Sequence, residues 1–160
     1  MSGRQGVVDA SVPNRVDAVD AYINVRRAEA VPGEKVLTWT EGNVDSPDPF
    51  LQRSAVVDLY FERQRPEAVP QLGRALRSDT VLPEVKRSAI DALEASKSPE
   101  AVRPLKEIAE NKKVQPTIRE EAVKAVEELP GGEQQLRQWS KSKDPIISPA
   151  ASDVLKGRTK

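Results

Sequence analysis

The chain has 160 residues, of which 38% are hydrophobic and only 4% aromatic, and its 25 basic residues balance its 25 acidic residues. It contains no cysteine and no histidine, which excludes disulfides, thiolate nucleophiles, Cys- or His-ligated metal sites and a Ser-His-Asp triad within this chain. The neutral net charge argues against a dedicated nucleic-acid binder, because such proteins carry a basic excess.

The N-terminal residues predict no packed element before Asn14. Residues 1–13 are small and polar, so we expect a flexible arm. They lack the apolar core of a signal peptide, and no stretch of the sequence approaches the roughly 20 apolar residues of a membrane span. We therefore expect a cytoplasmic protein with no membrane segment, and a mature exported fragment is the alternative.

Residues 14–45 predict a helix pair that diverges from the rest of the chain. The segment 14–30 places most of its apolar residues on one side of a helix, with Asn14 as the N-cap. The segment VLTWT at 36–40 could form a strand, because it mixes β-branched and aromatic residues. We favour a short helix from Gly33 to Asn43, since an isolated strand would have no pairing partner.

Three similar stretches follow. Ala55, Ala89 and Ala122 occupy the same place in each, with spacings of 34 and 33 residues. Apolar residues four before, one after and four after each alanine lie on one stripe of a helix. A second helix begins near Pro-Glu-Ala-Val in the first two stretches and after a Pro-Gly-Gly break in the third.

Proline-containing links separate these helix pairs. The pattern predicts repeats over 46–80, 81–113 and 114–141, with a terminal helix and tail over 142–160. A single helix pair cannot bury its own apolar face, whereas stacked copies can. We therefore predict one all-α domain over residues 14–160, an α-solenoid of about four antiparallel helix pairs plus the terminal helix.

The segments SPDPFLQRSAVVDL…PEAVPQLGRAL and LPEVKRSAIDAL…SPEAVRPLKEIA resemble HEAT-like repeats, of the short bacterial kind also found in phycobilisome lyases. The resemblance covers residues 46–113 well, 114–141 moderately and 142–160 in part. It implies a right-handed stack whose second helices line a concave binding face. The short second helix of the third repeat and the single helix of the last unit depart from the pattern.

Polar side chains off the apolar stripe of the second helices are the candidate binding residues. Arginines there could pair with carboxylates of a partner peptide, and an ordinary solvated helix face is the alternative. The candidates are Gln71, Arg74, Arg103, Lys106, Glu110, Arg137 and Gln138.

Two features of the first helices also give expectations. Arg53 and Arg87 are equivalent, and we expect each to join neighbouring repeats through a carboxylate. Tyr60 and Phe61 follow Leu59, and one helical stripe cannot bury three consecutive bulky residues, so at least one should be exposed. The carboxylates available to the arginines are Asp58, Asp91 and Glu94.

Together these observations predict a non-catalytic scaffold that binds a protein partner on the second-helix face, without cofactor or metal. We expect a monomer or a weak oligomer. Two alternatives stay open. The resemblance implies an accessory component of a bilin lyase-type or other enzyme complex. The excess of basic residues over 141–160 allows a nucleic-acid-binding repeat module, whose affinity for nucleic acid would fall steeply with salt.

Overall fold

The computed structural model describes residues 32–158, which form helices joined by short turns and contain no strand. This confirms the all-α prediction. The helices are α3 (Gly33–Glu41), α4 (Pro49–Phe61), α5 (Ala68–Arg77), α6 (Pro83–Ser96), α7 (Val102–Glu110), α8 (Pro116–Ala125), α9 (Gly132–Ser140) and α10 (Ile147–Arg158), with 3-10 turns at Pro99–Ala101 and Val126–Glu128.

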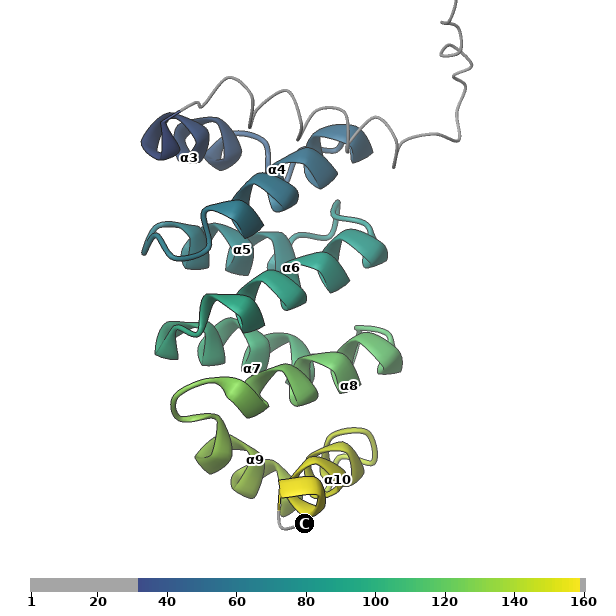
Figure 1. The fold of residues 1–160 in the computed structure, drawn as a ribbon. Helices are drawn as coiled ribbons and strands as arrows, with labels where there is room; N and C mark the ends of the chain where they lie inside the picture. Colours follow the sequence, from purple (N-terminus) through teal and green to yellow (C-terminus); the bar gives the residue numbers. More distant parts are fainter. Residues whose placement is uncertain (1–31, 159–160) are drawn as a thin grey trace, which may run out of the picture.

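The helices stack in two layers (Figure 1). The first helices of successive repeats, α4, α6, α8 and α10, form one layer, and α3, α5 and α7 form the other, which α9 continues. The first helices contact one another more extensively along the stack than the second helices do. This arrangement is the predicted helical solenoid.

The short helix expected over Gly33–Asn43 is confirmed as α3, which ends at Glu41. It packs against α4 and α5, at the N-terminal end of the layer that contains α5 and α7. The helix expected over 14–30 and the flexible arm expected over 1–13 lie outside the described residues.

Proline marks the first residue of three first helices. Pro49, Pro83 and Pro116 begin α4, α6 and α8, where a missing N–H removes no intrahelical hydrogen bond. Asp48 also caps α4, because its side chain accepts a hydrogen bond of 2.8 Å from the Phe50 N–H. The links between repeats therefore fix where each first helix starts.

The repeated apolar positions form one continuous core. Ala55, Ala89 and Ala122 are all 0% exposed, as are Leu59 and Leu93 one turn later in the first two repeats. Burial of each leucine side chain contributes roughly 1.5–3 kcal/mol. Small residues at the alanine positions let the first helices pack closely on their neighbours.

Ion pairs join consecutive repeats at the surface. Arg53 bonds to Glu84 at 2.6 Å, and Arg87 bonds to Glu121 at 3.0 Å. Both contacts confirm the expected link to the next repeat, and both use glutamates that the sequence analysis did not name. Such exposed pairs contribute about 0–1 kcal/mol each, so they secure register more than stability.

Candidate functional site

A groove of about 490 Å³ lies between α5 and α7, the second helices of the first two repeats. It lies on the helix layer for which the sequence predicted a binding face. Its apolar lining comprises Pro66, Val69, Pro70, Gly73 and Pro104, and its charged lining comprises Arg77, Glu100 and Arg103.

Proline and glycine shape this groove. Pro70 and Pro104 are each the third residue of their helices, within the first turn, whose N–H groups have no intrahelical acceptor. A Cβ on Gly73 would lie 3.3 Å from the Cβ of Pro104, closer than ordinary van der Waals contact. Glycine at position 73 therefore allows α5 to approach α7 closely.

The two arginines that line the groove share a single carboxylate, that of Glu107. Arg77 donates to one oxygen of Glu107 at 2.8 Å, and Arg103 lies 3.7 Å from the other oxygen of the same carboxylate. The Arg103 side chain is 85% exposed, so its guanidinium keeps donors for a carboxylate from outside the chain. Glu100 accepts a 2.9 Å hydrogen bond from Ser98. An apolar hollow beside an accessible cation suits an extended acidic peptide.

Two of the predicted residues on α5 are already engaged with α3 and the turn after it. Gln71 is buried, accepts a 2.6 Å hydrogen bond from Thr40 and donates at 3.1 Å to the Leu37 carbonyl. Arg74 donates to Asp45 at 3.2 Å and to the Glu41 carbonyl. Both side chains join α5 to α3 and the turn after it, and neither lines the groove.

The remaining predicted residues lie on α7 and α9, outside the groove. Lys106 and Glu110 form an ion pair of 3.7 Å, and Glu110 also accepts a 2.9 Å hydrogen bond from the Trp139 indole. Arg137 pairs with Glu133 on the same helix, and Gln138 is exposed. The structure thus places one of the seven candidates, Arg103, in the groove. That these residues bind a partner stays a prediction.

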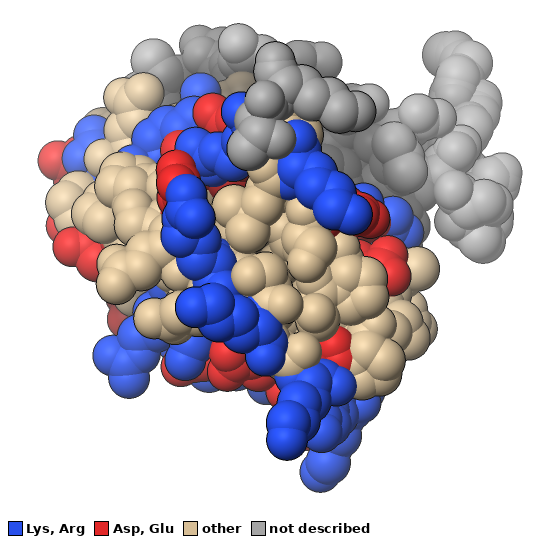
Figure 2. All heavy atoms as spheres, turned by 90° about the horizontal axis from the view of Figure 1, so that it is seen from below, with Lys and Arg blue, Asp and Glu red and all other residues tan. Residues whose placement is uncertain are grey.

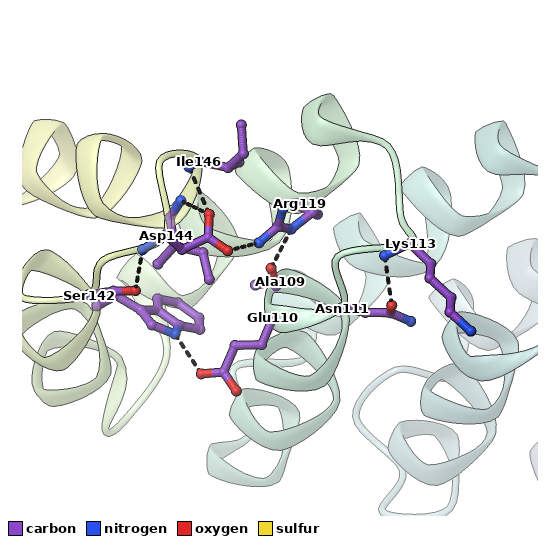
Figure 3. Close-up of polar contacts among 10 residues, drawn as sticks. Ala109, Glu110, Asn111, Lys113, Arg119, Ser142, Asp144 and Ile146 are labelled. Carbon is purple, nitrogen blue, oxygen red and sulfur yellow. Dashed lines mark hydrogen bonds and ion pairs between the residues drawn. The ribbon is translucent and has the colours of Figure 1, made fainter.

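A buried polar network that the sequence analysis missed joins α7, α8 and the link before α10 (Figure 3). Arg119 donates to the Ala109 carbonyl at 2.7 Å and to the Asp144 carboxylate. Asp144 also accepts from the backbone N–H of Ile146 at 2.8 Å and of Ile147 at 3.2 Å, and so caps α10. The signal in the sequence was a charged residue, Arg119, in register with the polar Gln52 of the first repeat, and the structure buries both side chains.

Asp144 remains ionised in this network. Burial alone would raise its pKa, but the hydrogen bonds from the Ile146 N–H, the Arg119 guanidinium and the Ile147 N–H outweigh burial and lower the pKa. The side chains of Arg119 and Asp144 are only 6% and 9% exposed. The pair is therefore a structural contact shielded from solvent.

A second, open hollow lies at the C-terminal ends of α4 and α6, between Tyr60 and Lys97. Tyr60 is 39% and Phe61 44% exposed, which confirms that this bulky run cannot be buried on one stripe. Burial, together with the nearby charge of Glu121, raises the pKa of the Asp91 carboxyl beside this hollow. Its lining of Tyr60 with two acidic and two basic side chains contains no proline, unlike that of the groove.

Among residues 32–158, no three acidic side chains come together in a way that could hold a metal ion. In the same part of the chain, none of the helices combines the length and the apolar character that crossing a membrane requires.

Comparison with known proteins identifies the repeat. A family model described as HEAT repeats matches residues 37–127, from α3 to the 3-10 turn after α8, and this range contains the whole groove. The match does not single out the phycobilisome-lyase type. No curated protein and no solved structure matches the chain significantly.

Proposed function

The chain belongs to the HEAT-repeat family, and we propose that it is a non-catalytic interaction module that binds a protein partner in the groove between α5 and α7. HEAT repeats generally act as scaffolds for protein–protein interactions. The observation that carries the proposal is the groove itself, in which three proline rings lie beside the exposed Arg103 guanidinium.

The lining of the groove defines the partner segment. Proline rings and Val69 offer rigid apolar contact, so an extended chain with small apolar or proline residues fits without ordering flexible side chains on this protein. A carboxylate on that segment would meet Arg103 and Arg77. Because a hydrogen bond to a charged group contributes roughly 1.5–3 kcal/mol, one such contact changes affinity about tenfold or more.

The proposal can be tested by selecting random twelve-residue peptides displayed on phage against the full chain. Enriched peptides would then be titrated by fluorescence anisotropy against wild type, Arg103→Glu and Arg137→Glu. The two substituted side chains are 85% and 67% exposed and both pair with a glutamate four residues away, so Arg137→Glu is a matched control outside the groove.

We expect enriched peptides to combine proline or small apolar residues with an acidic residue. Arg103→Glu should weaken their binding about tenfold, whereas Arg137→Glu should leave it unchanged. Circular dichroism melts establish that both variants stay folded. Equal binding by wild type and a folded Arg103→Glu variant would place the interface elsewhere and contradict the proposal.

The charge at the C-terminal end of the stack does not favour the nucleic-acid alternative. Figure 2 shows the C-terminal end of the stack, where lysine and arginine side chains form separate runs around uncharged surface, with acidic side chains between them. Backbone recognition of nucleic acid uses a continuous basic patch or stripe. Salt dependence of the affinity for single- or double-stranded nucleic acid, compared with that for the peptides, would distinguish the cases, because several phosphate contacts give a much steeper slope than one carboxylate.

A further inference from the structure

The residue three positions after the link proline occupies the same place in four first helices. The four residues are Gln52, Lys86, Arg119 and Ser148. This place lies at the edge of the stack where the links between repeats run, so its side chain can tie a first helix to the links beside it.

In three of the four repeats this side chain is bonded within the chain. Gln52 donates at 2.7 Å to the carbonyls of both Ser46 and Thr80, and it accepts a 3.1 Å hydrogen bond from the Leu82 N–H. Arg119 donates to the Ala109 carbonyl and to Asp144 (Figure 3). Ser148 donates to the Ser140 carbonyl at 3.1 Å.

Lys86 is the exception. It is partly buried, yet within residues 32–158 its ammonium group has no hydrogen bond and no ion pair. A hollow of about 290 Å³ opens beside it, with an apolar lining that includes Val81 and Ile118. The charged lining is Arg77, Asp79, Lys86 and Lys113, which gives an excess of positive charge.

The Arg119 position shows what the Lys86 position lacks. Asp144, the residue before Pro145 in the following link, supplies the carboxylate that Arg119 binds. The equivalent residue in the link that follows Lys86 is Gln115, directly before Pro116, and it lines the hollow without a charge. The cation is thus present at Lys86 while its carboxylate partner is missing.

We propose that the hollow at Lys86 binds the carboxylate of an aspartate or glutamate side chain supplied by the partner segment. The inference rests on the proposed function, because the segment in the groove is the source of this carboxylate. Arg77 lines both the groove and the hollow, so one extended segment passes from the proline-lined groove to Lys86. The apolar lining accommodates the methylene groups of the acidic side chain.

The probes are two synthetic peptides, acetyl-Pro-Val-Pro-Glu-Pro-Val-Pro-Glu-amide and the same peptide with glutamine in place of glutamate. Affinities of both are measured for the full chain and for Lys86→Gln, which copies Gln52 at the equivalent position. Lys112→Gln is the control, since Lys112 is an exposed lysine in the link between α7 and α8 that does not line the hollow. The readout is the ratio of the two affinities.

Wild type should bind the glutamate peptide about a hundredfold more tightly than the glutamine peptide, because one carboxylate pairs with Arg103 and the other with Lys86, and each pairing contributes about tenfold. Lys86→Gln should lower this ratio about tenfold, which leaves the preference due to Arg103, and Lys112→Gln should preserve the wild-type ratio. A ratio that Lys86→Gln leaves unchanged overturns the proposal, as does the absence of any preference in wild type. Inorganic phosphate that displaces the glutamate peptide at low millimolar concentration would show a general anion site and would also overturn it.

A second variant places a carboxylate of this chain beside Lys86, where it would compete with the peptide carboxylate. Gln115→Asp places an acid where Asp144 stands relative to Arg119, and it should lower the ratio of the two affinities about tenfold, as Lys86→Gln does. Gln115→Asn can cap α8 equally well but adds no charge, so it should keep the preference. A preference unchanged by Gln115→Asp would mean that Lys86 does not hold the peptide carboxylate.

The experiments distinguish failure of the proposed peptide groove from failure of the proposed carboxylate site at Lys86. If the groove is correct and the hollow is not, Arg103→Glu weakens binding of the glutamate peptide while Lys86→Gln leaves the ratio of the two affinities unchanged. If the hollow is correct and the groove is not, Lys86→Gln abolishes the preference while Arg103→Glu alters neither affinity. Failure of both peptides to bind at millimolar concentration overturns both proposals.

Discussion

Replacing Asp144 by asparagine should destabilise the fold by about 3 kcal/mol. The substitution leaves the Arg119 guanidinium, whose side chain is 6% exposed, with the Ala109 carbonyl as its neutral partner. Removing one member of a buried ion pair costs about 3–5 kcal/mol, and we take the lower end because the pair lies at the edge of the stack. Asparagine still caps α10, so the loss reports the charge and not the cap.

Urea unfolding followed by circular dichroism measures this loss as a shift in midpoint at constant slope. Since the pKa of Asp144 is lowered in the folded state, its stabilisation is fully present above the ordinary carboxyl range and is lost as pH falls through the folded pKa. Asp144→Asn should therefore cost the same at pH 7 and pH 5 and progressively less below that range.

The companion variant is Arg119→Gln, which copies Gln52 at the equivalent position. Combined with Asp144→Asn, it should cost about 1–3 kcal/mol less than the sum of the single losses, because the buried charge disappears with its partner. A single loss below about 1 kcal/mol for Asp144→Asn, or additive losses in the double variant, would refute this account of the pair.

Two further predictions concern backbone contact and pH. Gly132→Ala should lower the free energy of unfolding by about 1–3 kcal/mol or more, because the new Cβ would lie 1.7 Å from the Val126 carbonyl oxygen. The control Gly157→Ala, whose Cβ would have nothing within 4 Å, should stabilise α10 by up to about 1 kcal/mol. Equal urea midpoints for the two variants would contradict the clash. Asp91→Asn should raise stability at pH 7 by less than about 1 kcal/mol, since burial raises the pKa of this carboxyl and ionisation above that pKa opposes folding. Thermal melts should show the gain at pH 7 and not at pH 3. A wild type more stable than the variant at pH 7 would contradict this prediction.

Most of the fold could be predicted because it rests on spacing. The buried alanines at 55, 89 and 122 and the prolines that begin α4, α6 and α8 recur at nearly fixed intervals, and helical periodicity then assigns the buried side. The helix α3 followed from the absence of a pairing partner for a strand. These features are local, so a single sequence contains them.

The groove could be predicted only in part, because it depends on which helices approach each other. Gln71 and Arg74 lie off the apolar stripe of α5, yet α3 and the turn after it supply Thr40 and Asp45 as their partners. Conversely, Pro70 and Pro104 were visible in the sequence as early helix residues, and only the packing of α5 on α7 turns them into a wall. Arg103 remained available because its one partner, Glu107, is shared.

The hollow illustrates the same limit. Alignment of the repeats puts Lys86 in register with Gln52 and Arg119, which is a property of the sequence. That two of these side chains bond to the links while the third does not is a property of the folded chain. Repetition thus predicts where a contact should occur, and the structure shows which copy lacks it.

The two helix layers pack unequally, and this decides which side of the stack can open when one repeat rotates against the next. The first helices contact one another more extensively than the second helices do. In the second layer, α5 approaches α7 where Gly73 lies against Pro104. Rotation of one repeat about the layer of first helices changes the separation of α5 and α7 and leaves the contacts among the first helices in place. We therefore expect the thickness of a segment bound between α5 and α7 to set the angle between the first two repeats, and with it the local curvature of the stack.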